Sequence, residues 1–92
     1  MSDDLVAFLR ARLEDDLATA DRLLEIMKSR TDAAHWGVRM LAEVNAKRAL
    51  IAETIEPYLG MDTTMARVAN QALRLLALPY ADHPDYRPEW RP

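Results

Sequence analysis

The feature that most constrains this fold lies in the last third of the chain, where residues 72–78 read Ala-Leu-Arg-Leu-Leu-Ala-Leu. A run this apolar must be buried, because its exposure to water is unfavourable. The run stops at Pro79 and gives way to a tail, residues 80–92, which contains two tyrosines, a tryptophan and further prolines. Such aromatic content is atypical of a disordered terminus. The sequence therefore predicts a core beside residues 72–78 and an ordered tail.

Length and composition limit the classes of protein to which this chain can belong. A chain of 92 residues, half of them hydrophobic and only two of them glycine, is typical of one small helical domain. The formal net charge of −3 argues against a protein dedicated to nucleic-acid binding. The absence of cysteine excludes disulfides, thiolate nucleophiles and cysteine-ligated zinc. Asp3 and Asp4 stand where a signal peptide would be basic, and every apolar run is far shorter than the ~20 residues that span a bilayer. We expect a soluble, cytoplasmic protein.

The spacing of apolar residues predicts three helices, from about residue 3 to 29, from 31 or 32 to 56, and from 62–64 to 78. Pro57 and Gly60 are expected to end the second helix. The third helix is expected to be the most buried element, with only its four polar residues reaching water. The expected core stripe of the first helix is Leu5, Phe8, Leu9, Leu13, Leu17, Ala20, Leu24 and Met27, and that of the second is Ala34, Val38, Leu41, Val44, Ile51 and Ile55.

The predicted fold class is all-α: a long antiparallel helical hairpin, a short third helix and an ordered C-terminal tail. Residues 1–79 would form a helical bundle domain on which residues 80–92 pack. A helix of ~26 residues is ~39 Å long, whereas a compact chain of this size has a diameter of only ~30 Å. The hairpin would therefore expose a flank, and we expect a homodimer to cover it. The alternative is a monomer whose first helix is broken near Asp21.

Residues 73–90, LRLLALPYADHPDYRPEW, resemble the C-terminal signature of a domain-of-unknown-function family of short actinobacterial proteins and their phage relatives. Residues 4–13 and 39–48 are similar to the same family. The family has no established activity, so the resemblance implies no catalytic residue. It does imply a phage-encoded modulator of a host protein. A Thr-Pro-Gly-Pro-Trp stretch and cysteines that many members carry are missing here, so no metal or redox role is implied.

Metal and catalytic chemistry have weak support. Asp82, His83 and Asp85 cluster in the tail and His35 begins the second helix, but no spacing matches a zinc motif. Asp-His-Pro-Asp is also typical of a turn. No nucleophile stands in an activating context, and no glycine-rich phosphate loop is present. We expect no metal, no cofactor and no enzymatic activity, and keep a metal-assisted enzyme as the third hypothesis.

Residues 58–78 have the outline of a helix-turn-helix, which makes a small DNA-binding regulator the alternative hypothesis. However, Pro57 lies inside the supposed first helix, and Glu56 occupies a position where a small residue normally packs. Basic residues are also scattered, so we do not expect a nucleic-acid partner. The candidate DNA contacts of this hypothesis are Arg67, Asn70, Gln71 and Arg74.

Protein binding is the favoured hypothesis. On the second helix, Trp36, Met40 and Lys47 form a stripe opposite Val38 and Leu41, which either the third helix, the tail or a partner must cover. The tail aromatics either fold back on the bundle or recognise a partner. We expect a non-enzymatic interaction or accessory protein that acts through helical surfaces as a homodimer. The candidate contacts in the tail are Tyr80, Tyr86 and Trp90.

Overall fold

A computed structural model describes residues 2–27, 31–61 and 64–92, and confirms the all-α fold. No strand occurs within these ranges. The predicted end of the first helix at residue 29 and the predicted start of the third at 62 or 63 lie outside them. The elements are α1 (Ser2–Met27), α2 (Thr31–Leu50), the π-helical turn η1 (Ile51–Ile55), α3 (Glu56–Leu59), α4 (Thr64–Ala77), and the 3₁₀ turns η2 (Leu78–Tyr80) and η3 (Pro88–Trp90).

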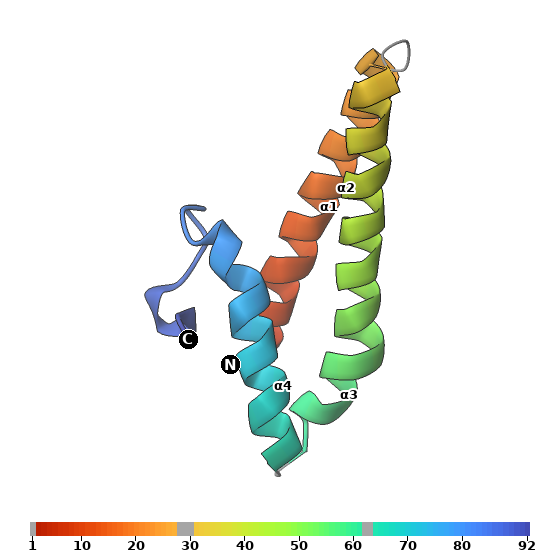
Figure 1. Ribbon diagram of the computed structural model, residues 1–92. Coiled ribbons are helices and arrows are strands. Elements are labelled where there is room, and N and C mark those ends of the chain that lie inside the picture. Colours follow the sequence, from red (N-terminus) through yellow and green to blue (C-terminus); the bar gives the residue numbers. More distant parts are fainter. Residues whose placement is uncertain (1, 28–30, 62–63) are drawn as a thin grey trace.

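The two long helices lie side by side and run in opposite directions (Figure 1). α4 packs against α1 and η1, and the tail returns to α1. Both lie along the part of the hairpin nearest the N-terminus, and the rest of the hairpin extends beyond them (Figure 1). The Cα extents are 51 × 27 × 16 Å and the radius of gyration is 15.1 Å, against about 12 Å for a compact chain of this length. α1 continues through Asp21 without a break.

The packing of α2 against α1 differs from the prediction at one point. Leu5, Leu9 and Leu13 of α1 are buried as expected, but Val38 of α2 is 60% exposed. Gly37 faces α1 in its place, and a Cβ atom at Gly37 would lie only 2.5 Å from the Leu24 Cδ2 atom. The two helices therefore approach closely where α2 has no side chain, and this contact turns Val38 outward.

A π-helical turn carries the second helix through Pro57 to Leu59, beyond the predicted end at Glu56. Proline has no N–H to donate, and its ring would collide with the carbonyl four residues earlier in a regular α-helix. The preceding turn widens, and the Glu56 N–H donates to the Ile51 carbonyl, five residues back. Gly60 then serves as the C-cap in a right-handed conformation.

The expectation that the third helix is the most buried element is wrong. Only Ala69, Leu73 and Ala77 of α4 are buried, at a spacing of four residues that forms one narrow face. One hairpin can cover only one face of a helix. Ala72 and Leu76 are partly buried against the core, and the remaining large apolar side chains of the helix stay exposed. Large exposed side chains in this region are Met61, Met65, Val68, Leu75 and Leu78.

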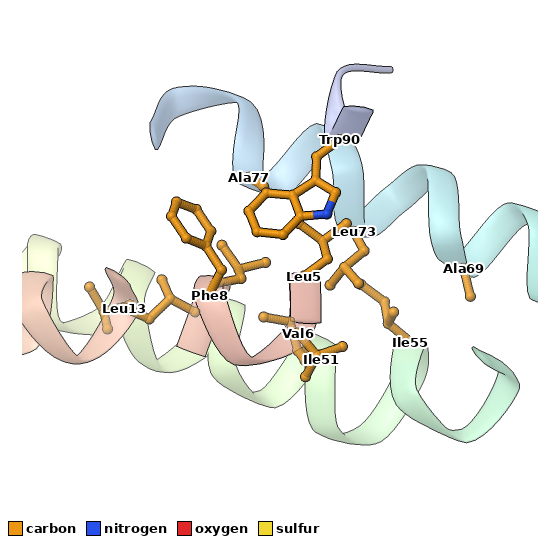
Figure 2. Close-up of a cluster of buried hydrophobic side chains, with 12 residues drawn as sticks. Leu5, Val6, Phe8, Leu13, Ile51, Ile55, Ala69, Leu73, Ala77 and Trp90 are labelled. Atoms are coloured by element: carbon orange, nitrogen blue, oxygen red, sulfur yellow. The ribbon is translucent and has the colours of Figure 1, made fainter. Parts of the chain in front are cut away.

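The core lies where α1, η1, α4 and the tail meet (Figure 2). Among the described residues it contains no buried polar or charged side chain. None of the described helices is long and apolar enough to cross a lipid bilayer. The buried core residues are Leu5, Val6, Phe8, Leu9, Leu13, Val44, Ile51, Ile55, Ala69, Leu73, Ala77 and Trp90.

Candidate interaction surfaces

An aromatic cluster of Phe8, His83, Tyr86 and Trp90 attaches the tail to α1. Trp90 is only 5% exposed, and its ring centroid lies 5.0 Å from that of Phe8 and 5.6 Å from that of Tyr86. His83 and Tyr86 meet the Phe8 ring edge-on, at 5.6 and 5.8 Å. Aromatic pairs in such geometry add to the stabilisation by burial. Trp90, one of the candidate partner contacts, is therefore a core residue in this structure, and Tyr86 is half-buried beside it.

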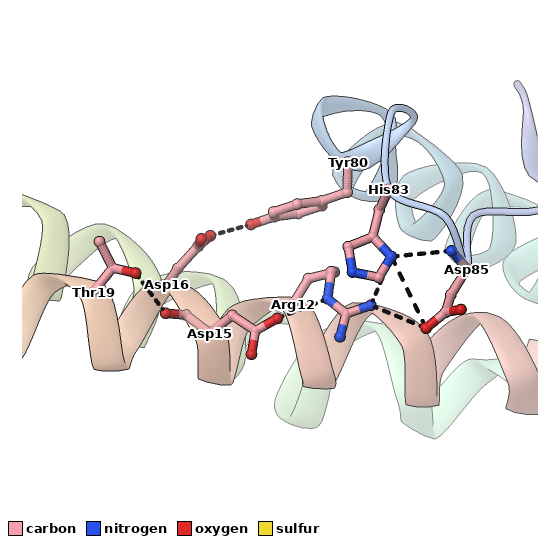
Figure 3. Close-up of polar contacts among 7 residues, drawn as sticks. All are labelled: Arg12, Asp15, Asp16, Thr19, Tyr80, His83 and Asp85. Carbon is pink, nitrogen blue, oxygen red and sulfur yellow. Dashed lines mark hydrogen bonds and ion pairs between the residues drawn. The ribbon is translucent and has the colours of Figure 1, made fainter.

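Tyr80 makes a second attachment of the tail. Its hydroxyl donates a hydrogen bond of 2.5 Å to the Asp16 carboxylate on α1 (Figure 3). Burial raises the pKa of the Tyr80 hydroxyl above its ordinary value, and the hydrogen bond and negative charge of Asp16 raise it further. The third aromatic candidate in the tail is thus also engaged with the bundle.

Arg12 is the central residue of the polar contacts beneath the tail, and the sequence did not single it out as a candidate site residue. Its side chain is only 14% exposed and its guanidinium lies 5.1 Å from the centroid of the Phe8 ring. Its Nη1 lies 3.1 Å from His83 Nδ1 and its Nε donates to Asp15 at 3.0 Å (Figure 3). His83 Nδ1 also accepts the backbone N–H of Asp85, so the ring proton belongs on Nε2. The only feature of the sequence that indicated a paired arginine here was the group of acidic residues close after Arg12.

The polar groups around Arg12 hold the tail on α1, and those that could have served as metal ligands or catalytic groups are paired with neighbours. The His83 Nδ1 atom faces two donors, Arg12 and the Asp85 amide, and Asp16 is engaged by Tyr80. His35 is exposed on α2. Within the ranges that the structure describes, no three His, Cys, Asp or Glu side chains are grouped closely enough to hold a metal ion.

The candidate DNA contacts on α4 divide into two pairs. Arg67 and Gln71 are exposed. Arg74 Nε donates to the Asn70 Oδ1 at 2.8 Å. Its Nη1 donates to the backbone carbonyls of two tail residues, Glu89 at 3.0 Å and Arg91 at 3.3 Å. Arg74 and Asn70 therefore act together in positioning the tail on α4.

The α2 candidates do not form one open stripe. Trp36 is 67% exposed, with the Arg39 guanidinium 6.0 Å from the centroid of its ring. Met40 and Lys47 are half-buried. Trp36 lies near the start of α2, and this end of α2 belongs to the part of the hairpin that extends beyond α4 (Figure 1).

A more continuous apolar surface lies on α4. We call Met65, Val68, Ala72 and Leu75 the α4 stripe, because successive members are three, four and three residues apart. Met65, Val68 and Leu75 are 49%, 58% and 53% exposed, and Ala72 is half-buried. The sequence did carry a signal for this surface. The apolar residues of this helix occupy more of its circumference than one neighbouring hairpin can cover.

The comparisons with known proteins place the chain in a family without assigning it an activity. No curated protein and no solved structure matches it. A family model described as a family of unknown function, DUF6221, matches residues 2–92, which include both long helices, α4 and the tail. The chain therefore belongs to the DUF6221 family.

Proposed function

We propose that this chain is a non-enzymatic interaction or accessory protein that acts through its helical surfaces as a homodimer. The observation that carries the proposal is the excess of accessible surface. The chain exposes 6365 Å², whereas a folded monomer of 10.5 kDa exposes about 5,400 Å². Large apolar side chains such as Trp36, Val68 and Leu75 are more than half exposed, and exposed apolar patches mark sites of association.

The elongated shape supports the same proposal. The hairpin extends beyond α4 and the tail, so among the described residues its distal half packs almost entirely through its own two helices (Figure 1). Three large apolar side chains of α1 and α2, Ile26, Trp36 and Val38, are each at least 60% exposed in that half. These exposed side chains could pack against a second copy of the chain or against a further protein partner.

The two other hypotheses have less support. A DNA-binding regulator would need Arg74 free to reach a phosphate or base, and Arg74 holds the tail carbonyls. A metal-assisted enzyme would need a ligand set, and the tail histidine and Asp16 are engaged by neighbouring groups. The resemblance to phage proteins extends the proposal to a modulator of a host protein.

The solution mass tests the proposal directly. Light scattering coupled to size exclusion, run over a wide range of protein concentration, should give twice the chain mass of 10.5 kDa. A mass of one chain at every concentration would overturn the homodimer. Binding to duplex DNA that weakens steeply with salt and with Arg67→Ala would favour the regulator instead.

A further inference from the structure

We infer that the α4 stripe is the seam of the homodimer, where Met65, Val68, Ala72 and Leu75 of one copy pack on the same residues of the second. This inference rests on the proposed function and names the surface that the two copies share. A contact between identical patches closes on itself around a two-fold axis and does not propagate into fibres.

The spacing of the stripe fits helix-to-helix packing. Residues separated by three and four positions repeat every seven, which is the pattern of a helix that packs along another helix. Val68 and Leu75 are one such repeat apart and are both more than half exposed. Ala72 lies between them, and its small side chain allows two helix backbones to approach closely. The stripe thus has larger apolar side chains on either side of the small Ala72 side chain at its centre.

The area of surplus surface also fits a second copy. The chain exposes about 900 Å² more than expected for its mass, and a standard interface buries about 800 Å² on each partner. The other large exposed apolar side chains, Ile26 on α1 and Trp36 and Val38 on α2, do not form a regular stripe on one helix. Among the described residues, α4 carries the heptad-spaced row in which three large apolar side chains, Met65, Val68 and Leu75, are exposed together.

The charges of α4 do not oppose self-association. The helix Thr64–Ala77 contains no acidic residue, and its basic residues are Arg67 and Arg74. Arg74 is directed to the tail carbonyls. Two copies placed stripe to stripe would therefore juxtapose apolar side chains without rows of like charge. The association should then depend little on salt, unlike binding of an acidic partner.

Charge substitutions in the stripe provide the decisive experiment. Val68→Glu and Leu75→Glu should each reduce the solution mass to that of one chain, because a carboxylate would be buried in the seam without a partner. Both side chains are exposed in the single chain, so the helical circular dichroism spectrum should be retained. Trp36→Glu is the matched control, because Trp36 is at least as exposed as Val68 and Leu75 and lies outside the stripe, and this variant should leave the dimer intact.

A cross-link provides a test that does not depend on a charge. The chain has no cysteine, so Ala72→Cys introduces a single thiol at the centre of the stripe. Mild oxidation should convert this variant to a covalent dimer, whereas Ala42→Cys, on an exposed position of α2, should stay uncoupled. A wild-type chain that is monomeric would overturn the proposed function. A wild-type dimer that survives both charged stripe variants, and does not cross-link through Ala72→Cys, would overturn this inference alone.

Discussion

Replacing Trp90 with alanine tests whether the tail is a structural part of this small domain. Trp90 is 95% buried, and a buried tryptophan removes about 200 Å² from water. At about 25 cal/mol per Å², this burial contributes up to about 5 kcal/mol. We therefore expect Trp90→Ala to lower the free energy of unfolding by about 3–4 kcal/mol, within the range for such truncations.

This loss would be a large part of the total, because a domain of this size has a stability of roughly 5–14 kcal/mol. Trp36→Ala is the matched control, since Trp36 is 67% exposed and the chain has no third tryptophan. Its effect should stay within about 0.5 kcal/mol. Urea denaturation followed by far-ultraviolet circular dichroism measures both, at one fixed protein concentration because dimerisation would shift the midpoint.

Fluorescence gives an independent measure of the same contact. In Trp36→Ala the remaining tryptophan is Trp90, whose emission should be blue-shifted and should move to the red when the chain unfolds. In Trp90→Ala the remaining Trp36 should emit as a solvated residue from the start. A loss below about 1 kcal/mol in Trp90→Ala, together with red emission from Trp90 in the folded chain, would refute the packing of the tail described above.

Two further predictions concern Tyr80 and Gly37. The pKa of Tyr80 is raised in the folded chain, so the contribution of Tyr80 to stability is complete below the unfolded value of about 10 and is lost as the pH rises above it. Denaturation curves between about pH 8 and 11 should therefore show a decline in the free energy of unfolding that is smaller in Tyr80→Phe than in the wild type. Equal declines in the two proteins would contradict the Asp16 contact. A side chain at Gly37 would collide with Leu24, so Gly37→Val should lower the free energy of unfolding by about 1–3 kcal/mol. Gly60→Ala, with nothing within 4 Å of its Cβ position, should be neutral, and equal stability of the two variants would refute the close helix approach.

The sequence predicts features that depend on local chemistry better than those that depend on tertiary neighbours. The α1 stripe and the end of α4 before Pro79 follow from periodicity and from the geometry of proline. The outward position of Val38 could not be predicted, because hydrophobicity ranks valine above the Gly37 that meets α1. The pairing of Arg12 also depends on the fold. Local spacing favours Asp16 as its partner, but Tyr80 engages Asp16 from the tail.

The tail and the α4 stripe are coupled through the position of α4, and this coupling can be tested in one direction. α4 is held by its buried face and by the hydrogen bonds from Arg74 to the tail carbonyls. Release of the tail in Trp90→Ala should therefore loosen α4 and weaken the dimer as well as the fold. The reverse should not hold, because Val68 and Leu75 are exposed and form no part of the core. In a Trp36→Ala background, Val68→Glu should give a monomer whose Trp90 emission is unchanged. A red shift in that variant would show that the stripe and the tail form one cooperative unit and that the stripe is not a separate binding surface.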